Sequence, residues 1–234
     1  MRIAVFSDIH GNWRAMEAVL ADLDGRADVV VCGGDVAWGG PWPDRVIEAL
    51  KAGGWPVVLG NTDVAAADES VARHEPWARW ARERLREHHL TFLSSLSLQQ
   101  QLETPAGPVL VVHSTPADPF AKLPAPSDGA GLERLFGQAG VPLVVHGHDH
   151  LPSQARLSGV MVVGAGAVGL PLDGDPRACY VVVTAEPGGF TVEHRRVAYD
   201  VEAAVAEARE LEMPGAARWG EAVRRGVLPQ QVGG

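Results

Sequence analysis

Continuous apolar runs alternate with amphipathic segments over the first third of the chain. The apolar runs fall within residues 2–8, 29–35 and 56–61, and each ends in polar residues. Between them, residues 13–23 and 44–53 place apolar side chains at helical spacing. Short Val/Ile-rich runs separated by amphipathic helices are typical of parallel strands covered on both faces. We therefore expect three strands joined by two helices in this part of the chain.

The pattern changes after the first third. Residues Glu75–Ser97 are rich in Arg, Glu and Trp, and they predict an exposed helix with an apolar stripe. Further strands are predicted at 108–116, 142–150 and 159–166, followed by a hairpin with a Pro-Gly-Gly turn at 178–197. A last helix is expected to begin near Val201.

The chain contains no internal repeat and no linker long enough to divide it. We therefore expect one α/β domain over residues 1–212, followed by a weakly structured C-terminal tail over residues 213–234. Strands in both halves of the domain are compatible with two sheets packed together and with helices outside them.

The composition is ordinary for a globular protein, with an acidic balance. Of the 234 residues, 46% are hydrophobic and 21% are charged, and the formal net charge is −9. This charge argues against an extended nucleic-acid surface or an anionic membrane as partner, because both require a positive field. A small, locally positive site could still attract an anionic substrate.

We expect neither a signal peptide nor a membrane span. Asp8 and His10 interrupt the first apolar run, and the longest later one, Val160–Leu172, is Gly-rich and too short to cross a bilayer. Cys32 and Cys179 lie in separate strand-like runs without C-x-x-C spacing. We expect them to be buried free thiols in a cytoplasmic protein.

Polar side chains follow five successive predicted strands. They are Asp8-Ile9-His10, Gly34-Asp35, Gly60-Asn61, His113, and the stretch His146-Gly147-His148-Asp149-His150. In open α/β sheets, sites form outside the carboxyl ends of strands, so these groups could converge. Carboxylate, imidazole and amide together suit a first-row divalent metal.

Each of these pieces also has an ordinary structural interpretation. Asp8 could cap the following helix, Gly33-Gly34-Asp35 could be a simple turn, and a lone His113 is often a structural histidine. Three histidines within residues 146–150 are harder to dismiss, and it is improbable that all five strand ends are structural at once. There are ligands for two ions, which would need a bridging carboxylate, and Asp35 is the natural bridge.

Taken together, these motifs resemble the calcineurin-like metallophosphoesterase superfamily. The family pattern is D-x-H, G-D, G-N-H-D/E, a lone H, and G-H-x-H, in the order found here between residues 8 and 150. The phrases SDIHGN and GDVAWGGP are similar to the small prokaryotic phosphodiesterase-like branch. The resemblance implies a four-layered α/β/β/α sandwich of two mixed sheets with flanking helices.

The resemblance also implies two divalent metal ions. One would be bound by Asp8, His10, His150 and the shared Asp35, and the other by Asp35, Asn61, His113 and His148. Asp35, Asn61 and His148 are in addition the residues expected to be catalytic. Manganese is the expected metal, while iron, zinc, nickel and magnesium are compatible with the same ligands.

Four further residues are expected to support this site from behind. Asp63 would hold its loop, and Asn12 would either shape the pocket or start a helix. His146 would be either a substitute acid or a packed histidine. Thr62 departs from the family pattern, because many members carry histidine there; threonine donates a hydrogen bond but cannot act as a general acid near neutral pH. We expect rates lower by roughly 10²–10⁴ and leaving groups that depart without a proton.

These features predict a metal-dependent phosphodiesterase acting on a small phosphoester, with nucleotide-like compounds among the candidates. In the implied mechanism, a hydroxide bridging the two ions attacks phosphorus in line. A phosphomonoesterase or protein phosphatase is the first alternative, against which the missing histidine and the lack of an evident basic groove weigh. A non-catalytic protein-interaction scaffold is the second, against which the complete ligand set weighs.

The remaining distinctive residues have simpler interpretations. Trp77, Trp80 and the charged run Arg82–Glu87 are expected to form a solvated helix packed by its aromatic residues, with a homodimer surface or a substrate lid as alternatives. The Gly-rich stretch Gly164–Pro171 is interpreted as close backbone packing, because it does not open a helix after a first strand. No function is assigned to the other histidines, His74, His88, His89 and His194.

Overall fold

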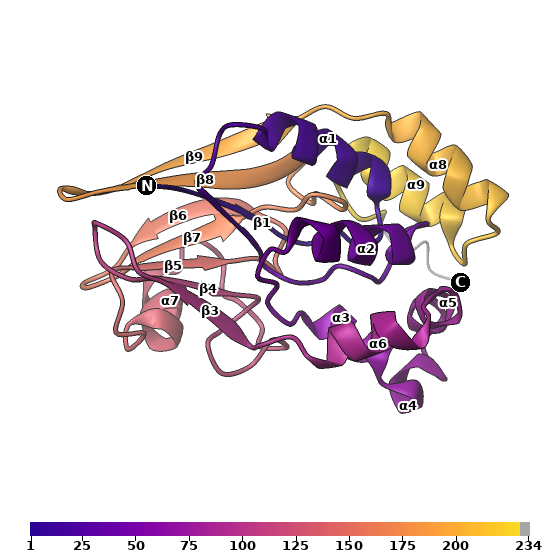
Figure 1. Ribbon diagram of the computed structural model, residues 1–234, viewed down its shortest axis with the longest axis horizontal. Helices are drawn as coiled ribbons and strands as arrows, with labels where there is room; N and C mark the ends of the chain where they lie inside the picture. Colours follow the sequence, from indigo (N-terminus) through magenta and orange to yellow (C-terminus); the bar gives the residue numbers. More distant parts are fainter. Residues whose placement is uncertain (230–234) are drawn as a thin grey trace.

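Two mixed β-sheets form the centre of the computed structural model, which describes residues 1–229 (Figure 1). The first has the order β2-β1-β8-β9 and contains β1 (Arg2–Phe6), β2 (Val29–Cys32), β8 (Ala178–Glu186) and β9 (Gly189–Val197). The second has the order β3-β4-β5-β7-β6 and contains β3 (Gln99–Leu102), β4 (Val109–Val112), β5 (Leu143–His146), β6 (Pro152–Arg156) and β7 (Met161–Ala165). β1 pairs parallel with β2 and antiparallel with β8, so the sheet is mixed.

The alternation of side chains along β1 determines how the layers pack. Ile3 and Val5 belong to a core shared with residues of the second sheet such as Val111 and Val145, so the two sheets pack face to face. The intervening side chains point the other way, and Phe6 packs in a cluster with residues of the helices. Apolar residues on both faces exclude water from both sides of the strand.

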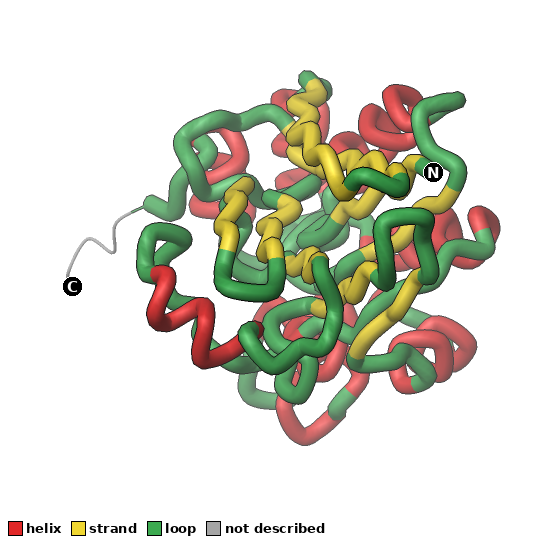
Figure 2. Tube along the Cα trace, turned by 90° about the vertical axis from the view of Figure 1, so that its left-hand side faces the viewer, coloured by secondary structure: helices red, strands yellow, loops and turns green. Residues whose placement is uncertain are grey.

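Helices cover the outer face of each sheet. The first sheet is covered by helices that include α1 (Trp13–Leu23) and α2 (Pro43–Gly53), and the second by α7 (Gly129–Phe136). The resulting order of layers is α/β/β/α, which confirms the expected fold. In the view of Figure 2, helices and loops lie around the strands of the two sheets.

Four short helices follow α2 and the segment of Val57 and Val58. They are α3 (Asn61–Ala67), α4 (Glu69–Ala72), α5 (Pro76–Arg84) and α6 (Glu87–Ser94). The single helix predicted over Glu75–Ser97 is therefore two helices. The chain is extended at Leu85 and Arg86, where the ring of His89 caps the start of α6 by accepting from the Arg86 N–H.

The third strand predicted from the sequence, over 56–61, is not a member of either sheet. Val57 and Val58 make only isolated bridges, to Cys32 and Ser97. The apolar run is too short to pair further, because α3 begins at Asn61. The sequence analysis also missed β3, β6 and α7, whose polar or Gly-containing sequences lack a clear period. The hairpin over 178–197 is confirmed, with Glu186 paired to Gly189.

The expectation of a weakly structured tail was wrong for residues 216–225. They form α9 (Ala216–Arg225), which packs on α8 (Val201–Glu210), the predicted last helix. Trp219 is 1% exposed, and Ala222 and Val223 are buried beside it. This i, i+3, i+4 spacing is the helical signal that the surrounding Gly and Pro obscured. The division of the chain at residue 212 stays a prediction, and residues 230–234 lie outside the described part.

Both cysteines are buried and free, as expected. Burial raises the pKa of the Cys32 thiol well above its ordinary value. Among residues 1–229, none of the helices combines the length and the apolar character that a membrane crossing requires.

The packing of α9 can be tested with one substitution. We expect Trp219→Ala to lower the free energy of unfolding by about 3–5 kcal/mol, because it empties a buried site the size of an indole. Leu228→Ala, at a side chain that is 54% exposed, is the control in the same segment and should change it by less than about 0.5 kcal/mol. Urea denaturation measures both. Equal, small effects would mean that the segment contributes little to folding.

Candidate metal centre

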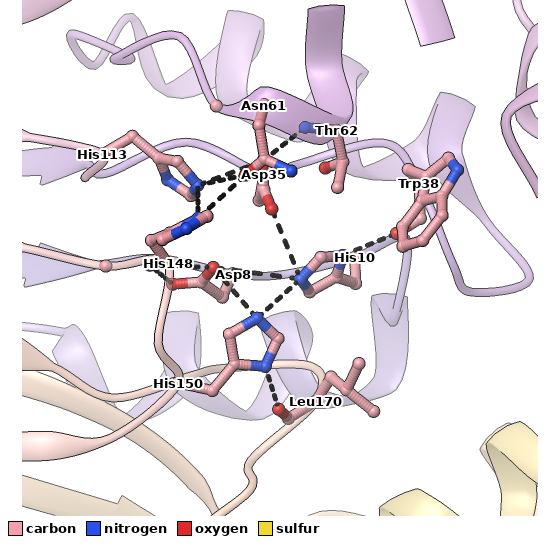
Figure 3. Close-up of polar contacts among 12 residues, drawn as sticks. Asp8, His10, Asp35, Trp38, Asn61, Thr62, His113, His148, His150 and Leu170 are labelled. Atoms are coloured by element: carbon pink, nitrogen blue, oxygen red, sulfur yellow. Dashed lines mark hydrogen bonds and ion pairs between the residues drawn. The ribbon is translucent and has the colours of Figure 1, made fainter. Parts of the chain in front are cut away.

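Seven side chains converge beside the carboxyl ends of the strands (Figure 3). They are the predicted ligands, namely Asp8 and His10 after β1, Asp35 after β2, Asn61 at the start of α3, His113 after β4, and His148 and His150 after β5. The structure thus brings all seven together. Asn61 is presented by the first turn of a helix and not by a strand, which corrects the sequence analysis.

One group of possible ligands consists of Asp8, His10 and His150. The Nε2 atoms of the two rings lie 3.1 Å apart. His150 Nε2 lies 3.3 Å from Asp8 Oδ1, and His10 Nε2 lies 3.8 Å from the same oxygen. Lone pairs of buried nitrogen and oxygen atoms at these distances repel one another unless a proton or a cation lies between them. The donor set therefore fits a divalent ion.

A second group lies on the other side of Asp35. His113 Nε2 and His148 Nδ1 are each 2.9 Å from Asn61 Oδ1, and the two nitrogens are 3.3 Å apart. Asp35 Oδ1 lies 3.4 Å from His113 Nε2, whereas its Oδ2 lies 3.7 Å from His10 Nε2 in the first group. The Asp35 carboxylate thus presents one oxygen to each group.

The histidine rings are oriented by bonds on their far sides. The Nδ1 atoms of His10, His113 and His150 lie 2.7, 2.9 and 2.5 Å from the carbonyl oxygens of Trp38, Gly33 and Leu170. A carbonyl only accepts, so each Nδ1 carries a proton, and in the neutral ring that binds a metal the lone pair is on Nε2, which faces the site. His148 differs, because its Nδ1 faces the site.

Left-handed backbone is concentrated in these residues. The φ angles are 56° at Asp8, 50° at His10, 55° at Asp35, 72° at His148 and 61° at His150. Among the described non-glycine residues, only Glu212 also has a positive φ. This conformation turns the chain sharply after a strand, and Asp tolerates it better than most residues. Such strain is typical of functional sites.

Comparison with known proteins agrees with this geometry. The sequence profile of the calcineurin-like phosphoesterase superfamily domain matches residues 1–188. The chain belongs to this superfamily.

Three similar proteins cover most of the chain. It is similar to a metallophosphoesterase from Sphaerobacter thermophilus, with 30% identity, a TM-score of 0.79, and coverage of 97% of this chain and 99% of that one. A hypothetical protein from Pyrococcus horikoshii OT3, PH1004, shares the fold, with 19% identity, a TM-score of 0.86 and the same coverage. An uncharacterized protein of Methanocaldococcus jannaschii, MJ0912, is 27% identical over 223 residues, covering 86% of this chain and 89% of that one.

In this member of the superfamily, Asp63 holds the loop that carries Asp35. Its carboxylate accepts hydrogen bonds from the backbone N–H groups of Asp35 and Val36, at 2.9 Å each, and of Gly60, at 3.1 Å. Burial raises the pKa of Asp63 to about 7, and the charge of Asp35 adds to the increase, whereas these donors oppose it. A side chain at Gly60 would collide with Asp35, which explains the glycine.

The other predicted supporting residues are placed as follows. Asn12 caps α1 by accepting from the Ala15 N–H, so it has the helix-start role. His146 stacks on Phe136, with ring centroids 5.8 Å apart, and does not line the cavity beside the site. This favours the packed histidine over a substitute acid. Thr62 does line that cavity, and its Oγ1 has no hydrogen-bond partner among the described residues.

Carboxylates and imidazoles compensate one another in this site. Burial raises the pKa of Asp35, but the His113 and His10 rings outweigh burial and hold it well below its ordinary value. Burial lowers the pKa of His113, but Asp35 outweighs it and raises the pKa to about 10. Burial likewise lowers the pKa of His150, and Asp8 outweighs it, so the net pKa is raised. When no metal is bound, protons on the histidine rings compensate the negative charges of the carboxylates.

A cavity of about 700 Å³ opens over the site. One wall consists of the predicted residues, including His10, Asp35, Asn61, Thr62, His148 and His150. The rest of the lining includes Trp38, Glu75, Trp77, Leu170, Arg218 and Trp219, of which the sequence analysis singled out only Trp77. These residues come from segments far apart in the chain, so no spacing in the sequence connects them.

A third cluster, of Glu48, His88 and His89, lies elsewhere. Both His Nε2 atoms contact Glu48 Oε1, at 2.8 and 2.7 Å. The Nδ1 of His89 accepts from the Arg86 N–H, so its Nε2 carries the proton that it donates to Glu48. The lone pair that a metal needs is thus directed at the backbone, and we assign the cluster a structural role.

The protonated state of His113 predicts how metal affinity depends on pH. With a pKa near 10, the His113 ring carries a second proton and a positive charge at pH 7. A histidine that binds a metal must be neutral, so metal binding releases that second proton. We expect the affinity for Mn²⁺ to rise by about tenfold per pH unit for each proton released, between about pH 6 and 9.

Titration calorimetry at pH 7 in two buffers of different ionisation enthalpy counts the released protons. His113→Gln should release fewer protons than the unchanged protein, whereas His88→Asn, at an exposed ring outside the site, should release the same number. Identical enthalpies in both buffers, with an affinity independent of pH, would contradict this account of the site.

Proposed function

We propose that the protein is a phosphodiesterase with a dinuclear metal centre. The observation that carries the proposal is the position of Asp35, whose two oxygens face two separate groups of ligands. A pair of divalent ions held there would act as Lewis acids on the phosphoryl oxygens and would activate water for in-line attack on phosphorus. Manganese is the metal that we expect.

The proposed roles of the ligands follow their two groups. Asp8, His10 and His150 hold one ion, and Asn61, His113 and His148 hold the other, with Asp35 shared. The carbonyl oxygens behind three of the rings keep them in the tautomer that binding requires. Asp63 and the left-handed turns fix the spacing of the two groups before any ion binds.

Thr62 determines the kind of ester that reacts in this proposal. Thr62 lines the cavity, its buried hydroxyl has no hydrogen-bond partner among the described residues, and its backbone N–H donates to Asp35 Oδ1 at 2.9 Å. The hydroxyl can donate a hydrogen bond to a phosphoryl oxygen, but it cannot protonate a leaving group at neutral pH. The substrate should therefore carry a leaving group that departs as a stable anion.

The rest of the cavity lining favours a diester over a monoester. It offers one cation, Arg218, beside mostly apolar and aromatic side chains. A monoester dianion would gain little from such a wall, whereas the second organic group of a diester can be buried against it. This supports the phosphodiesterase over the phosphomonoesterase or protein phosphatase.

Initial rates on bis(p-nitrophenyl) phosphate and p-nitrophenyl phosphate test the proposal. With added Mn²⁺ we expect faster turnover of the diester, and loss of turnover with a chelator. A preference for the monoester would overturn the phosphodiesterase assignment. If neither ester reacts with any divalent metal, the scaffold becomes the better account.

A substitution at the shared carboxylate tests the dinuclear centre. We expect Asp35→Asn to reduce kcat for the diester by at least about 10²-fold, because the amide cannot serve two ions with two anionic oxygens. Asp24→Asn, at an exposed aspartate outside the site, is the matched control and should leave the rate unchanged. Circular dichroism checks that both variants are folded. Full activity of Asp35→Asn would contradict the role of this residue.

A further inference from the structure

Three tryptophans line the cavity beside the metal-binding residues. We call Trp38, Trp77 and Trp219 the aromatic wall; Trp38 and Trp77 are half-buried and present ring surface, whereas Trp219 is 1% exposed. They belong to the loop after β2, to α5 and to α9, so the wall joins parts of the chain that are far apart in sequence. None of the three is a proposed metal ligand, and the proposed function uses them only as apolar surface.

Two of these rings are fixed by their polar ends. The indole N–H of Trp38 donates to Glu75 Oε2 at 2.8 Å, and that of Trp77 donates to the Pro214 carbonyl at 2.6 Å. The two rings meet edge to face, with centroids 5.1 Å apart and planes at 69°. Because both N–H groups are engaged within the protein, the apolar ring surface is what these side chains can offer to a ligand.

The aromatic wall is continuous with the metal-binding residues. His10 Nδ1 lies 2.7 Å from the carbonyl oxygen of Trp38, and the two rings are 6.1 Å apart. Figure 3 shows Trp38 beyond His10, on the side away from His113. A group attached to a phosphate at the site would therefore reach the wall directly.

The charges of the cavity limit what this group can be. The Glu75 carboxylate already accepts two hydrogen bonds within the protein: its Oε2 accepts from the Trp38 indole N–H and from the backbone N–H of Ala78 in the first turn of α5. Arg218 forms no ion pair with any residue in 1–229. With one free cation, this wall cannot neutralise a polyphosphate or a nucleic-acid backbone, which need several. It suits one flat, largely apolar group with a hydrogen-bond acceptor at its edge.

We propose that the aromatic wall is a subsite for an aromatic group esterified to the reacting phosphate, and that Trp77 and Arg218 determine specificity there. The inference rests on the proposed phosphodiesterase function and names its substrate class. The group contacts the ring of Trp77, and Arg218 donates to an acceptor at its edge. An aryl group and a nucleobase share this chemistry, and they differ in the acceptors that they offer to Arg218.

Diesters with one common leaving group test the subsite. Methyl, phenyl and thymidine 5′ esters of p-nitrophenyl phosphate all release p-nitrophenolate, so differences in kcat/KM report on the other substituent. We expect the phenyl and thymidine esters to exceed the methyl ester by about five- to tenfold, mainly through KM. Trp77→Leu should reduce this ratio to near one.

Arg218→Ala distinguishes the two sources of the aromatic group. If Arg218→Ala lowers kcat/KM relative to the methyl ester for the thymidine ester alone, the group is a nucleoside. If the phenyl ester has the higher kcat/KM relative to the methyl ester, and Arg218→Ala leaves that ratio unchanged, the group is a simple aryl. Either result supports the subsite. Trp55→Leu, at a ring that packs on Phe6, and Arg225→Ala, in the same helix as Arg218, are the matched controls and should keep all ratios.

The outcome separates this inference from the proposed function. Metal-dependent turnover of all three diesters at equal kcat/KM would overturn the subsite and leave the phosphodiesterase standing. If no diester reacts, the proposed function fails, and binding of phenylphosphonate and methylphosphonate to the metal-loaded protein decides the subsite. Calorimetry should then show at least about fivefold tighter binding of phenylphosphonate that Trp77→Leu abolishes. Equal affinities would overturn the subsite.

Discussion

The left-handed backbone at the ends of the strands is the constraint on which the site depends. It occurs at five of the seven candidate ligands, namely Asp8, His10, Asp35, His148 and His150. Each such residue costs about 1–2 kcal/mol relative to ordinary backbone, so the turns persist only because their surroundings hold them. The buried carboxylate of Asp63 is the clearest of these supports, since it accepts from N–H groups of the Asp35 turn and from that of Gly60 in the loop before α3. Interactions formed on folding thus hold the candidate ligands in position before any metal binds.

The two ends of the chain contribute differently to the cavity. The superfamily profile ends at residue 188, and all candidate ligands lie before that point. Arg218 and Trp219, which also line the cavity, lie after it on α9, and the Pro214 carbonyl accepts from the indole N–H of Trp77. The part of the chain that the superfamily profile matches therefore supplies the candidate metal centre, while the C-terminal helices complete the surface that we propose to select the substrate.

Much of the candidate site could be predicted from the sequence, because its ligands belong to short motifs at the ends of apolar runs. The layers could also be predicted, since β1 has apolar residues on both faces. Asn61 was misplaced on a strand because the apolar run before it has no partner long enough to form a ladder. Of the rest of the cavity lining, only Trp77 was singled out, in a helix for which a substrate lid was one alternative. Trp38 and Trp219 line the same cavity only through tertiary packing, which leaves no period or spacing in the sequence.

The most direct test of the central claim is to locate bound metal. Crystals of the protein grown with Mn²⁺, and measured at the manganese absorption edge, would show the number and positions of the ions by anomalous scattering. The account predicts two ions per chain, about 3.5–4 Å apart, with one oxygen of Asp35 toward each. A single ion, or two ions that do not share Asp35, would contradict the dinuclear centre and the role assigned to the turns that build it.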